Sequence, residues 1–400
     1  MVPRRLIVGA IIAATPALAS GASLDASIGR ELFERNWVSA PSSTKSNDGL
    51  GPLYNATSCG ACHIRNPNAE FDETSVAPGT IVRIGNAKGA GDPIYGRQLQ
   101  TRGVGGQTPE ANPDITWTTT GTRRVASIKL FSQAYGPLAS DTKISLRRSS
   151  SLFGIGLLAQ IPDQEIRKRA DPDDANHDGI SGRAAQLGVG GKQQLGRFGW
   201  KAAQPSLAAQ TSMAFYNDIG LSTEAHPEPW GDCTPTQSAC RAAPHGAEKG
   251  EAEIPKSLVD LIVEYITSLP APAPVDAKPS DVAQGQAVFN RIGCAVCHAS
   301  LSLADGKTVA AYTDMLLHDM GPGLNDGIAE GAAPPGEWRT APLWDLGNNV
   351  KITGLLHDGR AASVSEAIQW HDGEAAQVRL RFNGLTLAEK DALIAFVSRL

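Results

Sequence analysis

Two short cysteine–histidine motifs constrain this chain more than any other feature of its sequence. The first reads Cys-Gly-Ala-Cys-His and ends at His63, and the second reads Cys-Ala-Val-Cys-His and ends at His298. Thiols three positions apart can each attack one vinyl group of a haem, and the next histidine then offers a ring nitrogen to the iron. A thioredoxin-like dithiol or half of a zinc site also uses Cys-x-x-Cys, but neither needs a histidine after both copies. The sequence therefore predicts two haem c cofactors with His63 and His298 as iron ligands, attached through Cys59, Cys62, Cys294 and Cys297.

The composition excludes several classes of protein. Hydrophobic residues make up 41% of the chain, too many for a disordered protein, and 42 Gly and 26 Pro indicate many turns and long loops. Lys and Arg number 36 against 41 Asp and Glu, so the chain has no overall basic field that would attract phosphates. We therefore expect a globular protein that does not bind nucleic acid.

The chain length and one connector predict two domains. A single hydrophobic core rarely grows beyond about 250–300 residues, and this chain has 400. A proline- and alanine-rich stretch over 269–281 lies between the two motifs and is typical of a stiff linker. We expect an N-terminal haem domain with insertions over 23–268 and a C-terminal cytochrome c-like domain over 282–400.

The first 22 residues have the pattern of a secretory signal peptide. Two arginines precede a short apolar run, and small residues follow around Ala17–Ala19. An uncleaved membrane anchor is the alternative, but the run is short for a membrane span and contains Pro16. We expect residues 1–22 to be removed, the mature chain to have no integral membrane span, and its location to be the oxidising periplasm.

The spacing of apolar residues predicts a mainly α fold. Helices are expected at four places: 27–40, 253–269, 280–299 and 386–400. Thr386 and Glu389 form a capping box at the start of the last one. The glycine- and proline-rich middle of the chain predicts long loops, small helices and a hairpin around Ile115–Phe131. The expected architecture is two cytochrome c-like haem domains with long loops and a little β structure in the N-terminal half.

The sixth ligand of each iron decides between two kinds of chemistry. A second histidine or a methionine favours electron transfer, whereas an open iron face permits reaction with peroxide. The candidates in the N-terminal half are His177, Met213, His226 and His245, and those in the C-terminal half are His318, Met320, His357 and His371.

Longer segments around the motifs resemble a known family, the bacterial di-haem oxidoreductases related to di-haem cytochrome c peroxidases, and most closely the branch labelled predicted thiol oxidoreductases. The segments span nearly all of the mature chain: 55–63, 147–166, 171–183, 196–202, 312–324, 339–347 and 355–375. The resemblance implies a periplasmic di-haem c-type cytochrome that passes electrons from a C-terminal low-spin haem to an N-terminal haem and acts as a peroxidase-like oxidoreductase. The alternatives are a non-catalytic electron carrier with both irons six-coordinate, and a thiol- or disulfide-linked oxidoreductase.

The same resemblance implies the ligands of the C-terminal haem. His371, after the His-Asp-Gly turn, occupies the place of the distal ligand, where the peroxidases resembled usually carry methionine. A bis-histidine haem has a lower potential, since a thioether stabilises ferrous iron better than an imidazole does. Met320 is the alternative ligand.

For the N-terminal haem, the resemblance implies peroxide chemistry with an acid–base group over an open iron face. Glu165 is the expected catalytic residue, and Gln164 lies in the same segment. A distal ligand on this iron, Met213 or His226, would abolish that chemistry.

The resemblance also implies a route and partners for electrons. Trp200 and Trp117 are candidates for an aromatic bridge between the haems, because the peroxidase relatives place a tryptophan in that gap; filling of the core is the alternative. The expected donor is a small redox protein or a quinol-linked cytochrome, and the expected acceptor is peroxide or another small substrate.

Two secondary sites complete the predictions. Asp174, Asn176 and Asp178 alternate before a glycine, which suits Ca²⁺, and calcium near the domain junction is known in the relatives; an Asx-rich turn is the alternative. Cys233 and Cys240 remain after the haem cysteines are assigned. In an exported protein they are expected to form a structural disulfide, with a redox-active pair as the alternative.

Overall fold

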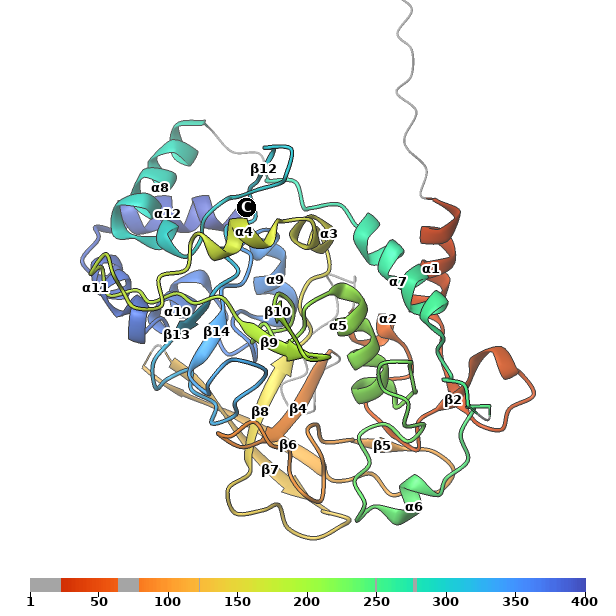
Figure 1. The fold of residues 1–400 in the computed structure, drawn as a ribbon. Coiled ribbons are helices and arrows are strands. Elements are labelled where there is room, and N and C mark those ends of the chain that lie inside the picture. The colour runs from red at the N-terminus through yellow and green to blue at the C-terminus, as the bar shows by residue number, and fades with distance from the viewer. Residues whose placement is uncertain (1–22, 64–78, 122, 249, 276–278) are drawn as a thin grey trace, which may run out of the picture.

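The computed structural model describes residues 23–400 except 64–78, 122, 249 and 276–278, so the predicted signal peptide lies outside the described residues (Figure 1). The α-helices are α1 Leu24–Glu34, α2 Cys59–Cys62, α3 Ile155–Ala159, α4 Asp163–Arg167, α5 Leu207–Ala214, α6 Ser238–Arg241, α7 Lys256–Ser268, α8 Pro279–Ile292, α9 Leu346–Thr353, α10 Val364–Gln369, α11 Ala376–Asn383 and α12 Leu387–Ser398. The shorter helical turns are η1 Lys45–Asn47, η2 Phe215–Ile219, η3 Cys294–Val296 and η4 Gly373–Ala375, of which η2 is a π-helix.

The strands form seven two-stranded sheets among the described residues. They are β1 Val38–Ser39, β2 Asp48–Leu50, β3 Leu53–Tyr54, β4 Thr80–Gly85, β5 Arg102–Gly103, β6 Asn112–Thr120, β7 Arg123–Phe131, β8 Lys143–Arg148, β9 Gln186–Val189, β10 Lys192–Leu195, β11 Leu301–Ser302, β12 Thr308–Val309, β13 Leu317–Asp319 and β14 Glu337–Arg339. The pairs are β1–β2, β3–β5, β4–β8, β6–β7, β9–β10, β11–β12 and β13–β14.

The prediction of a mainly α fold is wrong. The predicted hairpin is confirmed as β6–β7, whose register joins Asn112 to Phe131 at its open end. A second long pair, β4–β8, joins Thr80 to Arg148, and the C-terminal half holds strands as well. Pairs such as β4–β8 depend on contacts between residues far apart in the chain, so the local spacing of apolar residues does not reveal them.

Of the four helices predicted from apolar spacing, those over 253–269, 280–299 and 386–400 are confirmed as α7, α8 and α12, although α8 ends at Ile292. The helix predicted over 27–40 is only partly correct, because α1 ends at Glu34 and Val38–Ser39 is the strand β1. The Thr386 capping box is present: its side chain accepts the backbone N–H of Glu389, and the Glu389 carboxylate accepts the N–H of Thr386. Helices α8 and α12 approach each other closely at Gly285. A side chain at this position would collide with the carbonyl oxygen of Ala392, so glycine permits the contact. Phe289 and other apolar side chains fill this contact and form the core of the C-terminal half.

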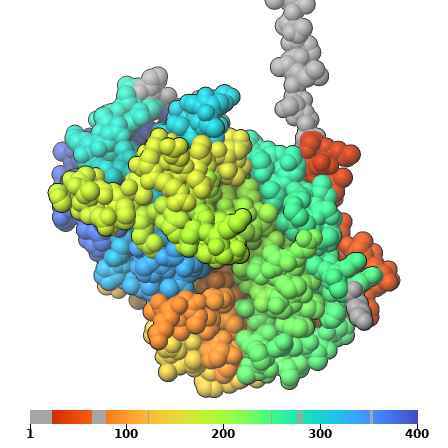
Figure 2. Space-filling model, in the orientation of Figure 1, coloured from red at the N-terminus to blue at the C-terminus, as the bar shows by residue number. Residues whose placement is uncertain are grey.

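The two halves of the chain share a third hydrophobic cluster. It contains Leu158 and Ile166 from the α3–α4 region and Met315 and Trp344 from the C-terminal half. Arg183 adds an ion pair to Glu337 across the same contact. Figure 2 shows the segment coloured as residues 150–200 lying directly against the blue C-terminal segments. This contact holds the two cysteine–histidine motifs in one structure.

In the part of the chain that the structure describes, no helix combines the length and the apolar character needed to cross a membrane.

Candidate functional site

The first motif forms the single helical turn α2. The Ser58 hydroxyl accepts the N–H of Ala61 at 3.1 Å, and the His63 N–H donates to the Cys59 carbonyl at 3.0 Å, so the turn is closed at both ends. Cys59 and Cys62 are not joined in a disulfide. Burial, with the nearby Asp218 carboxylate, raises the pKa of both thiols to about 12. A reactive dithiol needs a lowered pKa, so these thiols lack that property.

The His63 ring is oriented for metal binding. Its Nδ1 lies 3.2 Å from the carbonyl oxygen of Ser150. A carbonyl only accepts, so Nδ1 carries the proton and Nε2 keeps a free lone pair, which is the arrangement of histidine ligands in metal sites. Burial lowers the pKa of His63 to about 4, so the ring is neutral.

A cavity of about 710 Å³ opens in front of this motif, and its volume is typical of a cofactor site. Cys59, Cys62 and His63 line it together with apolar side chains from several elements, namely Phe153, Leu158, Phe198, Ile262 and Ile266. Arg148 and Arg339 also line it, and burial lowers the pKa of each guanidinium group to about 10. Apolar walls suit a porphyrin, and the two cations suit its two propionate carboxylates, so these residues fit a haem.

The second motif follows α8 after a sharp break. Gly293 has a φ of 99°, a left-handed conformation that side chains with a Cβ rarely adopt. The motif then turns through η3, and the His298 N–H donates to the Cys294 carbonyl at 2.9 Å. The His298 Nδ1 donates to the Tyr312 carbonyl at 3.0 Å, which again leaves Nε2 free. Burial, with a contribution from His371, lowers the pKa of His298 to about 4.

His371 faces His298. The centres of the two rings are 6.4 Å apart. One iron held by a nitrogen of each ring, with bonds of about 2 Å, would place the ring centres about 6 Å apart. The His371 Nδ1 donates to the Ala367 carbonyl at 2.7 Å, so its Nε2 is free as well, and burial lowers its pKa. The spacing and the tautomers of both rings fit a haem iron between them.

Met320 lies in the turn after β13. Its backbone N–H donates to Gly336 at 3.1 Å, and its side chain packs against the C-terminal core. Among the interactions of the described residues, none joins Met320 to His298, whereas His371 is in ring contact with it.

The other histidines of the C-terminal half have different roles. His318 is held between two carboxylates, with Nδ1 at 2.7 Å from Glu374 and Nε2 at 2.9 Å from Asp314. Burial alone would lower its pKa, but the hydrogen bonds to Asp314, Cys297 and Glu374 raise the pKa to about 12. Each ring nitrogen faces a carboxylate oxygen, so His318 is part of a buried charged cluster with Asp314 and Glu374.

Sequence reasoning missed this cluster beside the second motif. The local signal for it in the sequence is the aspartate four positions before His318. His357 is buried and stacks on Trp338, with ring centres 3.9 Å apart. It is a packing residue of the core.

Glu165 does not lie in the cavity. Its buried carboxylate pairs with Lys168 and Arg169, which follow α4, and Glu165 is not among the described residues that line the cavity. Although burial would raise its pKa, these two cations lower it, so the group is an ion-paired carboxylate. Within the described residues, the acidic side chains in the cavity wall are Asp218 and Glu330.

The two tryptophans proposed as a bridge lie in different places. Trp200 lines the cavity, donates its Nε1–H to the Arg148 carbonyl at 2.8 Å, and packs against the core of the C-terminal half. Trp117 lies on the hairpin strand β6, where Arg124 covers its ring at 4.4 Å. Trp344, which the sequence did not single out, also lines the cavity and is buried.

The remaining ligand candidates of the N-terminal half also lie in different places. Met213 lines the same cavity as His63 and also the neighbouring smaller pocket. His226 lines a smaller pocket of about 450 Å³ and stacks on Tyr216 at 4.9 Å. His177 and His245 are exposed.

The predicted calcium loop is an exposed turn. The Asp174 carboxylate accepts the backbone N–H groups of Asp178 and Gly179, and the Asn176 side chain accepts the N–H of Asp178 at 2.9 Å. These are the hydrogen bonds of an Asx-rich turn.

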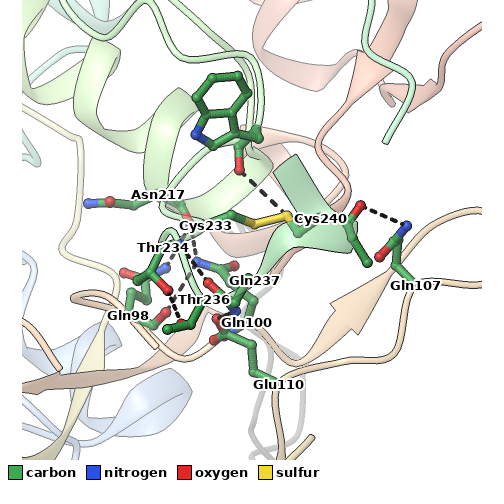
Figure 3. The surroundings of a disulfide bond; sticks show 12 residues. Gln98, Gln100, Gln107, Glu110, Asn217, Cys233, Thr234, Thr236, Gln237 and Cys240 are labelled. Atoms are coloured by element: carbon green, nitrogen blue, oxygen red, sulfur yellow. Dashed lines mark hydrogen bonds between the residues drawn. A yellow bond between two sulfur atoms is a disulfide. The ribbon is translucent and has the colours of Figure 1, made fainter. Parts of the chain in front are cut away.

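The structure joins Cys233 and Cys240 in a disulfide (Figure 3). Cys240 is fully buried and Cys233 nearly so. The Gln237 amide, between them in sequence, donates to the buried Glu110 carboxylate at 2.6 Å. A thiolate from solvent must reach a sulfur atom to exchange with it, so this burial suits a structural bond.

Comparison with known proteins gives one family. Residues 124–400 match the family model described as "Di-haem oxidoreductase, putative peroxidase". No curated protein matches the sequence. Among solved structures, the chain is similar to the diheme peroxidase BthA from Burkholderia thailandensis, at 14% identity over 94% of this chain and 85% of that chain, with a TM-score of 0.44. It is also similar to hydrazine synthase of Kuenenia stuttgartiensis, at 12% identity over 100% of both chains, with a TM-score of 0.36.

Proposed function

This chain belongs to the di-haem oxidoreductase family, and from that premise we propose that it is a di-haem c-type cytochrome that reduces peroxide. The observation that carries the proposal is the difference between the two motifs. His298 faces a second histidine ring at 6.4 Å. His63 faces a cavity of about 710 Å³. His63 is the only histidine among the described residues that line its cavity. A pair of histidines suits electron transfer, whereas an iron held by one histidine can leave a face open to peroxide, so the two motifs suit different roles.

Each motif would hold one haem through its two cysteines, with His63 and His298 on the irons and His371 as the distal ligand at the second site. When bound, the C-terminal haem would supply electron transfer from a donor to the N-terminal haem, and the N-terminal haem would supply the reduction of peroxide.

The chain's own residues would orient these groups. The carbonyls of Ser150, Tyr312 and Ala367 fix the tautomers of the three histidines. Because imidazole stabilises ferrous iron less than a thioether does, a second histidine would give the C-terminal site a low potential, which suits the entry of electrons. Trp200 lines the cavity and also packs against the C-terminal core, and this position supports its proposed role as a bridge for electrons between the two haems.

The cellular setting is part of the same proposal. Export of residues 23–400 to the periplasm would allow haem attachment and keep the disulfide oxidised. The electron donor would be a small redox protein or a quinol-linked cytochrome. Calcium at Asp174, Asn176 and Asp178 and the division into haem domains over 23–268 and 282–400 stay predictions.

One alternative has a specific observation in its favour. Met213 lines the first cavity, and as a sixth ligand it would make the protein an electron carrier without peroxidase activity. The thiol- or disulfide-linked alternative has less support, because the Cys233–Cys240 disulfide is buried.

The test is spin-resonance and electronic spectroscopy of the ferric protein, with peroxide-dependent oxidation of a reduced cytochrome c. The proposal expects one low-spin and one high-spin haem, and turnover of peroxide. Entirely low-spin spectra in both redox states, with no turnover, would favour the carrier. Met213→Ala separates the two, since it creates a high-spin component only if Met213 is a ligand.

A further inference from the structure

Asp218 occupies an unusual place in the wall of the first cavity. It lies in the π-helix η2, between α5 and a loop, and lines the cavity together with Cys59 and Cys62. Its backbone carbonyl accepts the N–H groups of Asn55 at 2.8 Å and Ala56 at 3.0 Å, which fixes the π-helix to the segment that leads into the first motif. π-Helical turns are rare and frequently occur at functional sites.

The Asp218 carboxyl group is partly buried and has no ion pair among the described residues. Its Oδ1 accepts the Nε2–H of Gln98 at 2.6 Å. The cation that acts on it is Arg83 of β4, which also lies 3.8 Å from Glu330. On the other side, the α2 thiols interact with it and carry no charge. Burial therefore raises the pKa of Asp218, with Gln98 and Arg83 opposing that shift.

A second observation points into the cavity beside this carboxyl group. The Asn217 side chain is 5% exposed and lines the cavity, and its buried Oδ1 has no hydrogen-bond partner among the described residues. Gln98 and Gln100 both donate to the Asn217 backbone carbonyl, so the residue is held in place (Figure 3). A buried acceptor without a partner calls for a donor such as a water molecule or a protonated ligand.

We propose that Asp218 is the group that takes up and releases the proton in the first haem cavity. The step rests on the proposed function. Peroxide, two electrons from the donor protein and two protons give two molecules of water. Asp218 gives one proton to the leaving oxygen as the O–O bond breaks, the solvent supplies the other, and water in the cavity then returns a proton to Asp218. Glu165, held by two cations outside the cavity wall, takes no part.

Redox titration tests proton uptake without peroxide. Reduction adds negative charge next to the Asp218 carboxylate, so a proton binds and the midpoint potential of the N-terminal haem falls as the pH rises. The midpoint potential should fall by up to about 59 mV per pH unit, which for one electron is a tenfold change in the equilibrium constant of reduction. Asp218→Asn is expected to raise the potential and abolish the slope, and to remove a protonated carboxyl band from the redox-difference infrared spectrum. Asp218→Glu is expected to keep both.

Asp232→Asn is the matched control. Asp232 is a partly buried carboxylate with a raised pKa, and it accepts the backbone N–H of the same Gln98 at 3.2 Å, but it is not among the described residues of the cavity wall. If Asp218→Asn fails to fold, Gln98→Met serves instead. It removes the donor to the carboxylate, so the pH at which the potential begins to fall should move upward.

The two proposals fail in different ways. The peroxidase function is overturned and the proton role is kept if the wild-type protein does not turn over peroxide but its midpoint potential depends on pH, and Asp218→Asn abolishes that dependence. If the wild-type protein turns over peroxide and Asp218→Asn has the same pH–rate profile and the same slope of potential against pH, the proton role is overturned and the peroxidase function is kept. The proton role is supported when the fall in rate at alkaline pH, where Asp218 loses the proton that it donates, disappears in Asp218→Asn and returns in Asp218→Glu.

Discussion

A buried charge cluster at the junction of the two halves gives the most quantitative prediction. The Asp326 carboxylate accepts from Arg147 at 2.5 Å and lies 3.3 Å from the Lys201 ammonium. Their side chains are 5%, 4% and 0% exposed, respectively. Both cations also lie over the Trp338 ring, at 4.4 and 4.2 Å. One carboxylate therefore balances two buried cations, and one of these, Arg147, also lines the cavity.

Asp326→Asn keeps the shape of the side chain and removes its charge. The two cations then stay buried without a counter-ion, and breaking a buried pair in this way costs about 3–5 kcal/mol. We expect the free energy of unfolding of the holoprotein, measured with guanidinium chloride, to fall by about that amount. Asp305→Asn is the control, because its pair with Lys307 at 2.8 Å is exposed and surface pairs contribute about 0–1 kcal/mol.

The pH dependence gives this prediction a second readout. Arg147 and Lys201 lower the pKa of Asp326 in the folded state, so its stabilising effect is present above the unfolded pKa and is lost as the pH falls through the folded pKa. Burial lowers the pKa of Lys201 to about 8. Lys201 can lose its proton above that pH, so the penalty of Asp326→Asn should shrink there. A variant within 1 kcal/mol of the wild type at neutral pH would refute this reasoning.

Three further predictions follow from the sites. His371→Ala should convert the low-spin C-terminal haem signal to a high-spin one, while Met320→Ala should leave it unchanged; the ferric spin-resonance spectrum decides, and the reverse result would transfer the ligand role to Met320. Replacing Cys233 and Cys240 by serine should lower the free energy of unfolding by about 2–3 kcal/mol, as expected for a short loop, with no change in peroxide turnover; loss of turnover at retained fold would make the disulfide redox-active. Trp200→Phe should leave both haem spectra intact and slow electron transfer between the haems in stopped-flow experiments, and an unchanged rate would exclude Trp200 as the bridge.

The sequence predicted the elements that depend on local patterns. Helices α7 and α12 follow from the spacing of apolar residues and a capping box, both of which act within a few residues. The resemblance to the family is confirmed by the match over 124–400. The strands β4 and β8 were missed, because each contributes only half of a pair that joins distant parts of the chain.

The candidate site was predictable where a motif fixes it and not where the fold does. His63 and His298 follow directly from the cysteines beside them. Asp218 has no motif around it, and it reaches the cavity only because a π-helix packs against the segment before Cys59. Glu165 lies outside the described cavity wall for the converse reason: its segment was recognisable, but Lys168 and Arg169 hold its carboxylate in ion pairs.

The central claim is that two haems are covalently attached to this chain, one at each motif. The most direct test is the intact mass of the mature protein, produced in a host that attaches haem c and measured after denaturation. The account predicts the mass of the polypeptide plus two haems, and plus one haem when Cys59 and Cys62 are replaced by alanine. A wild-type mass with one haem or none would contradict it.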